Sequence, residues 1–161
     1  IKIKNNFNKD GYYMNRLTNY CGHWVKYCGW YPDRKLRLWD SRKGKWTGIN
    51  PHDKYELTDG DKNTELLSGD LLHYSYNTLS DHYKQVEYFT TIASKAYFEK
   101  NKKAPFYKLV INPIFKFINH YLIRLGFLDG KSGFLISKIS AYATYLKYKK
   151  LRDLYYQNTT K

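Results

Sequence analysis

The sequence is poor in cysteine, proline and acidic residues, and it has no long hydrophobic run. Its 161 residues include 2 cysteines, 4 prolines and 14 acidic residues against 28 Lys and Arg. Cys21 and Cys28 alone exclude a disulfide-rich scaffold, and the absence of Cys-x-x-Cys or paired Cys/His spacing argues against a zinc site. Two thiols in the core of a protein from a reducing compartment are favoured over a local disulfide.

The lack of a long apolar run argues against a membrane span. Stretches without Lys or Arg fall far short of the roughly 20 apolar residues that cross a bilayer core. The chain opens on Ile-Lys-Ile-Lys-Asn-Asn, which does not resemble a signal peptide. It also lacks an initiator Met, which favours a start inside a longer protein.

Aromatic residues and positive charge are abundant instead. Tyr, Phe and Trp make up 19% of the chain, and a hydrophobic share of 42% excludes a disordered protein. The last 62 residues carry a net charge of +11, whereas the first 99 carry only +3. This asymmetry predicts an anionic partner for the C-terminal segment, such as phospholipid headgroups, nucleic acid or a phosphorylated glycolipid. The alternative is a solvated, Lys-rich helix face.

Residues 11–76 have the pattern of antiparallel strands. Short runs rich in Tyr, Trp, Leu and Thr alternate with turn-forming Pro, Gly, Asn and Asp, which favours hairpins over β-α-β units. The predicted strands are residues 11–20, 24–30, 35–40, 54–57 and 67–76.

Helical periodicity replaces this pattern farther along. Ser80 is expected to cap a helix that ends near Lys100. Its apolar positions fall on one face: Val86, Phe89, Ala93, Ala96 and Tyr97. A second helix is predicted over 106–125, with Pro113 kinking it or starting a new helix, and a third over 132–154. These late helices either lie in the plane of a membrane interface or form a soluble hairpin packed on the sheet.

The predicted fold class is therefore α+β. A β-rich segment, residues 1–78, precedes a helical and basic segment, residues 79–161, which consists of three amphipathic helices.

Several residues of the β-rich segment are candidates for chemistry. Arg34 and Arg37 follow a Tyr-Pro-Asp turn, and a guanidinium suits phosphate because it binds two oxygens at once. Residues three apart on a regular strand point to opposite faces, so only one of these two reaches a cleft unless the strand bulges. An ion pair is the alternative for each. His73 alternates with Leu71 and Ser75 on one strand face, where a buried core histidine is the alternative.

A second candidate segment runs from Trp46 through a Pro-bearing loop to His52 and Asp53. The carboxylate of Asp53 suits a general base, and the imidazole of His52 suits a metal ligand or a contact to a phosphate oxygen. A simple surface loop is the alternative.

The order of these pieces resembles that in bacterial family 2 glycosyltransferases, most closely the lipopolysaccharide core glucosyltransferase type. The motifs that carry the resemblance are Asn15-Arg-Leu-Thr-Asn-Tyr, Cys28-Gly-Trp-Tyr-Pro-Asp-Arg-Lys-Leu-Arg-Leu-Trp, Pro51-His-Asp, Leu71-Leu-His-Tyr-Ser-Tyr and Gly126-Phe-Leu-Asp-Gly. Together they span about residues 11–151.

The resemblance implies the acceptor-side part of a GT-A fold that lacks its N-terminal, nucleotide-binding α/β half. Such enzymes transfer a sugar from a nucleotide-sugar donor with inversion and use a divalent metal, Mg²⁺ or Mn²⁺, held mostly by an Asp-x-Asp motif in that half. This chain has no such motif; Asp33 and Asp59-Gly-Asp61 lie outside the family pattern. The fragment is thus expected to be inactive alone.

Carried over to this chain, the resemblance assigns catalysis to Asp53 as base and His52 as its assistant and tentative metal ligand. The family more often has Glu in place of Asp53. Substrate binding is expected at Arg34, Arg37, His73 and Trp46. The expected acceptor is a lipid-linked glycan such as lipopolysaccharide core, and the expected location is cytoplasmic, peripheral on the anionic inner face of the bacterial inner membrane. No nucleic acid partner is expected.

Two rival functions remain. A basic, Tyr-rich chain fits a nucleic-acid-binding module, although it shows no RNP, zinc-finger or helix-turn-helix signature. A membrane-associated adaptor without catalysis is the second.

Overall fold

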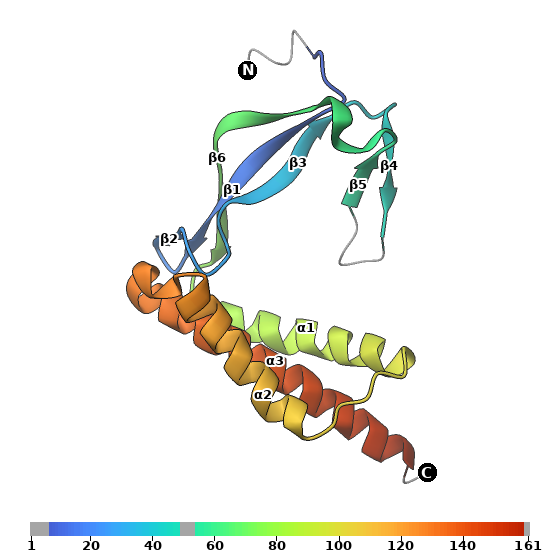
Figure 1. Ribbon diagram of the computed structural model, residues 1–161, viewed down its shortest axis with the longest axis vertical. Coiled ribbons are helices and arrows are strands. Elements are labelled where there is room, and N and C mark those ends of the chain that lie inside the picture. The colour runs from blue at the N-terminus through green and yellow to red at the C-terminus, as the bar shows by residue number, and fades with distance from the viewer. Residues whose placement is uncertain (1–6, 49–53, 160–161) are drawn as a thin grey trace. The chain divides into compact units, whose positions relative to one another are not determined.

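The computed structural model describes residues 7–48 and 54–159, and it has the α+β fold predicted, with antiparallel strands followed by helices (Figure 1). The chain divides into two compact units. The first comprises the residues up to Leu17 together with Pro32–His73, and the second comprises Thr18–Tyr31 together with Tyr74 and all later residues. The predicted boundary after residue 78 follows the change from strands to helices, whereas the compact units interleave along the chain. As a division into domains, that boundary stays a prediction.

The first unit is built on β1, an antiparallel strand that pairs with both β3 and β6. A separate two-stranded sheet pairs β4 with β5. The bounds are β1 Gly11–Tyr20, β3 Asp33–Trp39, β4 Gly44–Thr47, β5 Lys54–Leu57 and β6 Thr64–Tyr76. The sequence pattern predicted all of these except β4, which begins at a turn residue, Gly44, and is followed by Gly48. Asp33 is the first residue of β3, whereas the sequence pattern predicted that it lies in a turn.

The pairing of β1 with β3 shifts register once. Tyr12 lies opposite Leu38 while Tyr13 lies opposite Leu36, so Arg37 is the extra residue of a β-bulge. On a regular strand, Arg34 and Arg37 would point to opposite faces. The bulge interrupts this alternation, which is the condition predicted from the sequence for both side chains to reach one cleft.

The second unit is helical, with β2, His23–Val25, pairing with the end of β1. Helix α3 packs against both α1 and α2. The helices are α1 Leu79–Glu99, α2 Tyr107–Ile118 and α3 Gly130–Thr159, with a π-helical turn, Asn119–Ile123, and a 3₁₀ turn, Gly126–Asp129, between the last two. Buried side chains form two clusters, Tyr20, Val25, Cys28 and Ile136, and Val86, Ile139 and Leu146.

Helix α1 departs from two expectations. Its N-cap is Thr78 and not Ser80, because the Thr78 hydroxyl and the Asp81 carboxylate bond each other's backbone N–H groups as a capping box. Its buried face also contains Thr90 and Ser94, whereas Phe89 is exposed.

Helix α2 continues through Pro113, which lies inside it and starts no second helix. Both cysteines are free thiols, but only Cys28 is in the core, since Cys21 is exposed. Within the described residues, no helix has both the length and the apolar character needed to span a bilayer.

The Gly126–Asp129 turn contains a buried carboxylate that accepts hydrogen bonds from the segment after β2. Asp129 accepts hydrogen bonds from the backbone N–H groups of Lys26 at 3.1 Å and Tyr27 at 2.8 Å, and it contacts His23 Nε2 at 3.2 Å. A Cβ at Gly133 would lie 1.7 Å from the Gly126 carbonyl oxygen, so α3 approaches the turn only with glycine there.

Candidate functional site

The two residues predicted to carry catalysis, His52 and Asp53, lie outside the described residues, so their roles stay predictions. Their place in the chain is nonetheless informative. Asp53 directly precedes β5, and both residues belong to the segment that connects β4 to β5. Residues of these two strands and of the neighbouring sheet therefore define the candidate site.

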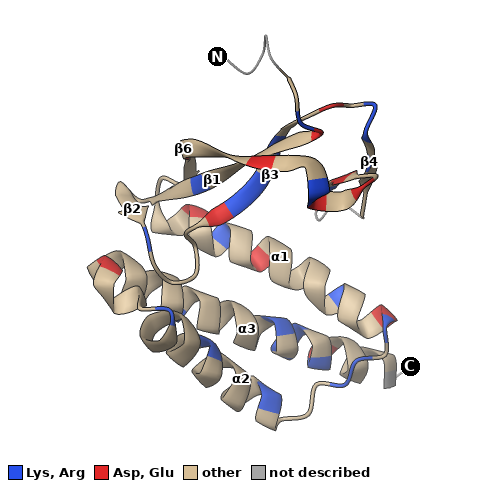
Figure 2. Ribbon diagram, turned by 45° about the horizontal axis from the view of Figure 1, so that its top comes forward, with Lys and Arg blue, Asp and Glu red and all other residues tan. Residues whose placement is uncertain are grey.

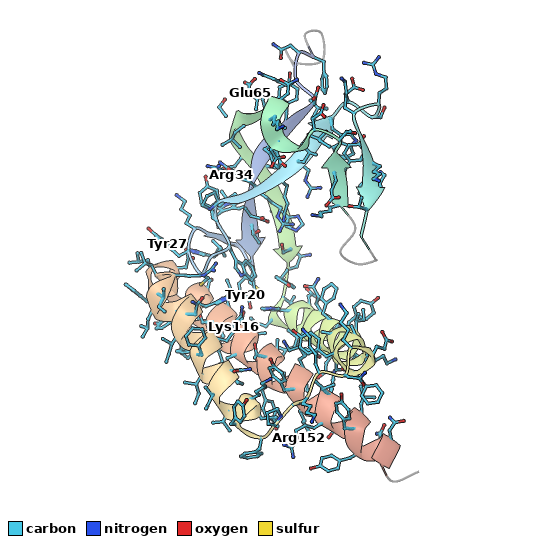
Figure 3. The ribbon with its side chains drawn as sticks, turned by 45° about the vertical axis from the view of Figure 1, so that its right-hand side comes forward. Tyr20, Tyr27, Arg34, Glu65, Lys116 and Arg152 are labelled. Atoms are coloured by element: carbon cyan, nitrogen blue, oxygen red, sulfur yellow. The ribbon has the colours of Figure 1, made fainter. Side chains whose placement is uncertain are left out.

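Arg34 lies on β3 (Figure 3) and lines a pocket of about 390 Å³. The other lining residues come from β1, the short turn before β6 and the start of β6: Tyr13, Asp61, Thr64 and Leu66. The Tyr13 hydroxyl donates to Asp61 Oδ1 at 2.6 Å, and this bond, together with burial and the carboxylate charge, raises the pKa of Tyr13 to about 12. The pocket thus combines an exposed guanidinium with a fixed hydroxyl and carboxylate.

Arg37 belongs to a different group, which surrounds His73 on β6. Burial lowers the pKa of His73, and the positive charges of Arg16 and Arg37 lower it further, while Asp33 opposes them. His73 is half-buried and neutral near pH 7, so it can accept or donate a hydrogen bond to a sugar hydroxyl. Of the predicted binding residues, His73 and Arg37 lie within electrostatic range of each other, and Arg34 lines the pocket.

The carboxylate of Asp33 raises the pKa of His73, and both of its oxygens are paired with basic side chains. Its Oδ2 pairs with Arg16 Nη2 at 2.5 Å and its Oδ1 with Lys35 Nζ at 3.1 Å. Arg16 and Lys35 therefore share one acid, and Arg37 adds a further positive charge near His73; the basic segments of β1 and β3 are visible in Figure 2. Such an excess of positive charge suits an anionic group.

Two residues of β1 belong to this region although the sequence pattern assigned them no role. Asn15 Oδ1 and Arg16 Nε are buried and have no hydrogen-bond partner among the residues that the structure describes. Buried polar atoms are nearly always paired, so unpaired ones call for a ligand or water. Asn15 lies directly opposite Arg34 in the strand pairing, and Arg16 lies opposite Asp33. Their motif, Asn15-Arg-Leu-Thr-Asn-Tyr, was visible in the sequence, but only strand register brings it to the arginines.

Trp46 is the exposed member of an aromatic group on the β4–β5 hairpin and β3. Trp39 and Tyr55 stack with centroids 4.7 Å apart, and Trp46 stands edge-on to both at 5.8 Å. The Tyr55 hydroxyl donates to the backbone oxygens of Asp40 and Ser41, which fixes the ring. With 62% of its surface exposed, Trp46 offers a ring face to a ligand while its neighbours hold it in place.

No metal centre is assembled by the residues that the structure describes. Among residues 7–48 and 54–159, no group of three His, Cys, Asp or Glu side chains is close enough to hold an ion. The predicted metal ligand, His52, is not among these residues.

Comparisons with known proteins identify three relatives, among them two Rickettsia proteins. The chain is 32% identical over 89 residues to an uncharacterized glycosyltransferase of Rickettsia prowazekii (strain Madrid E) and 30% identical over 89 residues to an uncharacterized glycosyltransferase of Rickettsia typhi (strain ATCC VR-144 / Wilmington). Each match covers 55% of this chain and 30% of the relative, so the chain spans less than a third of these proteins. No protein-family model matches the sequence. No solved structure matches it either.

Proposed function

We propose that this chain is the acceptor-side part of a glycosyltransferase. The observation that carries the proposal is the match over 89 residues to two proteins that bear that name. The unit that contains β3–β6 supports it, because it combines a fixed, exposed Trp46 with a cationic group and a neutral histidine. An aromatic ring that covers a sugar face, beside cations that receive phosphate, is a suitable arrangement for a glycosyl acceptor and a nucleotide-sugar donor.

The finer proposal is an inverting enzyme of family 2 with a GT-A fold. Asp53 removes the proton from an acceptor hydroxyl, whose oxygen attacks the anomeric carbon of the donor sugar. The bond to the nucleoside diphosphate breaks, and the diphosphate leaves with the electron pair while His52 and the arginines offset its charge. Asp53 is a shorter base than Glu, so it requires the acceptor to approach the β4–β5 connection closely.

We assign each of the proposed binding residues to one part of the substrates. Arg34, in its pocket, and Arg37, beside His73, are assigned to anionic groups of the substrates. Trp46 and His73 are assigned to the acceptor sugar. A divalent cation, Mg²⁺ or Mn²⁺, belongs to the proposal, but the described residues do not gather a ligand set for it. We therefore assign no step of the reaction to a metal.

The proposed acceptor is a lipid-linked glycan such as lipopolysaccharide core, at the cytoplasmic face of the bacterial inner membrane. The charge distribution supports this proposal, since the net charge of +11 in the last 62 residues suits an anionic membrane. The two relatives' names specify neither donor nor acceptor.

The test is sugar transfer by the full-length protein to which this chain belongs. Transfer of labelled sugar from a nucleotide-sugar panel to a membrane-extracted glycolipid would be measured for the wild type and for Asp53→Asn. Loss of the general base is expected to lower kcat by about 100-fold or more with little change in KM.

The matched control is Asp59→Asn, which makes the same change at an exposed turn residue of the same unit. Its activity is expected to equal that of the wild type. Wild-type activity in Asp53→Asn would remove the assignment of the base. Absence of transfer with every donor, in a folded protein, would instead favour the adaptor without catalysis.

A further inference from the structure

Helix α2 turns its apolar side away from the protein. Every residue of Phe106–Ile118 that is more than about one-third exposed is hydrophobic: Phe106, Tyr107, Val110, Ile111, Ile114, Phe115 and Ile118. Their exposed fractions range from 38% to 69%. The spacing of three and four residues places them on one continuous helix face.

The same surface extends past the end of α2. The π-helical turn and the 3₁₀ turn add exposed Leu122, Ile123, Leu125, Phe127 and Leu128. We call these twelve residues the apolar face. A monomer in water rarely leaves so many large apolar side chains exposed together, so a surface of this kind marks a binding site.

The polar residues of α2 lie on its other, more covered side. Lys108, Asn112 and Lys116 are all less exposed than the apolar face, and His120 in the following turn is buried. Burial lowers the pKa of Lys116, and the nearby charges of Arg124 and Lys147 lower it further. Apolar Leu109, Pro113 and Phe117 share this covered side, and Phe117 packs edge-on against Phe134 of α3. The apolar side chains on the exposed side are therefore available to a partner outside the described residues.

The charges around the apolar face indicate what this partner is. From Lys100 to Leu128 the sequence contains no acid, and the first one, Asp129, is buried and bonded to backbone N–H groups. Figure 2 shows α2 with basic but no acidic segments. Lys102, Lys103 and Arg124 are exposed next to the face.

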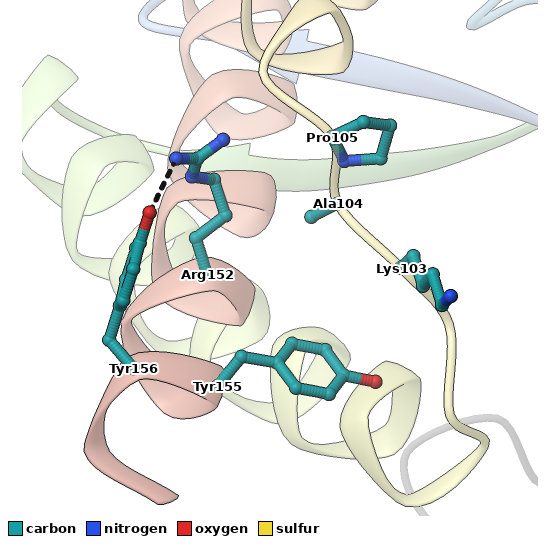
Figure 4. Close-up of a pocket in the computed structure, with 6 residues that line it drawn as sticks. All are labelled: Lys103, Ala104, Pro105, Arg152, Tyr155 and Tyr156. Atoms are coloured by element: carbon teal, nitrogen blue, oxygen red, sulfur yellow. Dashed lines mark hydrogen bonds between the residues drawn. The ribbon is translucent and has the colours of Figure 1, made fainter. Parts of the chain in front are cut away.

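A pocket of about 380 Å³ at the beginning of α2 adds to this charge (Figure 4). Lys103 and Arg152 line it together with Tyr155 and Tyr156, and Arg152 donates to the Tyr156 hydroxyl at 2.9 Å. The guanidinium of Arg152 also lies 5.8 Å from the ring centre of Phe106, the first residue of the apolar face. Cations and apolar rings meet here as they do at a phospholipid interface.

We propose that the apolar face docks the protein on an anionic phospholipid bilayer, with α2 lying in the plane of the interface. The apolar side chains enter the boundary of the acyl chains, and Lys102, Lys103, Arg124 and Arg152 contact lipid phosphates. A lipid surface accounts for both features at once, because an apolar layer is bordered on its outer side by negative charge. The inference assigns a docking surface and does not depend on the transferase reaction.

The test is flotation of the 161-residue chain with vesicles of phosphatidylcholine alone and of phosphatidylcholine mixed with phosphatidylglycerol. Binding is expected to be stronger to the anionic vesicles. The double variant Ile114→Glu, Phe115→Glu is expected to lower the partition coefficient by about tenfold or more for each residue, since each change removes one apolar anchor.

The matched control is the double variant Tyr83→Glu, Tyr88→Glu, which adds the same charge at exposed aromatic residues of α1. It is expected to bind far more tightly than the α2 variant, and far-UV circular dichroism would confirm that both are folded. Equal binding by the two double variants would overturn the proposal. It would also be overturned if the wild type did not bind vesicles but self-associated in solution through α2, because the occupant would then be a second copy. Since vesicle binding requires no sugar transfer, either result would leave the proposed activity standing.

Discussion

Asp129 shows how a single carboxylate can determine the conformation of a loop. It is 5% exposed, lies in the turn between the π-helical segment and α3, and accepts the backbone N–H groups of Lys26 and Tyr27. The motif Gly126–Gly130, part of the resemblance to glycosyltransferases, therefore has a structural role in this chain. Gly126 permits the close approach of the Cys28 side chain and of the backbone at His120, and the acid satisfies backbone donors of a segment distant in sequence.

Replacement of Asp129 tests this role. Asp129→Ala leaves two partly buried N–H groups without their acceptor, and we expect it to lower the free energy of unfolding by about 1–3 kcal/mol. Asp153→Ala is the matched control, because Asp153 is exposed on α3, and its effect should stay within about 0.5 kcal/mol. Urea unfolding followed by circular dichroism measures both. Similar stability of the two variants would contradict the structural role.

His82 is a buried histidine that stays neutral in the folded protein. Its Nδ1 is hydrogen-bonded to the Tyr20 hydroxyl at 2.9 Å, and its ring lies 4.4 Å from that of Tyr76. Burial lowers its pKa from 6.5 to about 4. His120 is lowered to about 4 as well, by burial and then by the charges of Lys116 and Arg124.

Stability is therefore expected to fall as the pH is lowered from about 6.5 to about 4. In this window the unfolded chain binds a proton at each histidine that the folded chain does not bind, so protons favour unfolding. Each residue contributes up to about 1.4 kcal/mol per pH unit. Urea midpoints measured across this range in the wild type and in His82→Gln, which keeps an acceptor for Tyr20, would show the effect. A variant with an unchanged pH dependence would rule out His82 as its source.

At the scale of elements, the sequence offers two candidates for the N-cap of α1, and the structure distinguishes between them. Thr78 and Ser80 are both good N-caps, but only Thr78 has an acid three residues later, and the structure forms the capping box with Asp81. Thr78→Ala is expected to cost about 1 kcal/mol of unfolding free energy, whereas Ser80→Ala should cost well under half of that. Thermal and urea unfolding of the two variants measure the difference. A larger loss in Ser80→Ala would place the cap two residues later.

Much of the fold could be predicted because hydrophobic period and turn chemistry are local. The bounds of β1 and β5 were predicted correctly from alternation between turn residues. The buried face of α1 was predicted only in part: Val86 is buried as expected, but the face also contains Thr90 and Ser94, and a count of apolar residues selects Phe89 in their place. The exposure of the apolar face of α2 could not be predicted from the helix alone. Periodicity identifies an apolar face, but it does not show which side of the helix the protein covers.

The candidate site could be predicted only in part, because it depends on strand register. Arg34, Arg37, His73 and Trp46 were selected from their residue types and from the family resemblance, and their binding roles stay predictions. Asn15 and Arg16 were missed because their unpaired buried atoms depend on the strands that pack beside β1. Cross-strand neighbours of this kind are not encoded at any fixed sequence separation.

At the scale of the whole molecule, net charge and apolar surface act together. The net charge of +14 will attract any polyanion, including RNA, through a force that salt screens. The apolar face adds a contribution that salt does not screen. The dependence of binding on salt therefore separates a membrane-docking protein from a nucleic-acid-binding module, even if both ligands bind at low ionic strength.

Oligonucleotide and vesicle binding are accordingly expected to respond differently to sodium chloride. Fluorescence anisotropy with a single-stranded RNA should show binding that is lost near 1 M salt, where the Debye length is about 3 Å. Flotation with anionic vesicles should weaken at first and then level off, because burial of the apolar face remains. The Ile114→Glu, Phe115→Glu variant should lose this salt-resistant part and keep RNA binding weakened only by its two added charges. If vesicle and RNA binding disappeared at the same salt concentration, the attraction would be purely electrostatic, and the apolar face would not enter the bilayer.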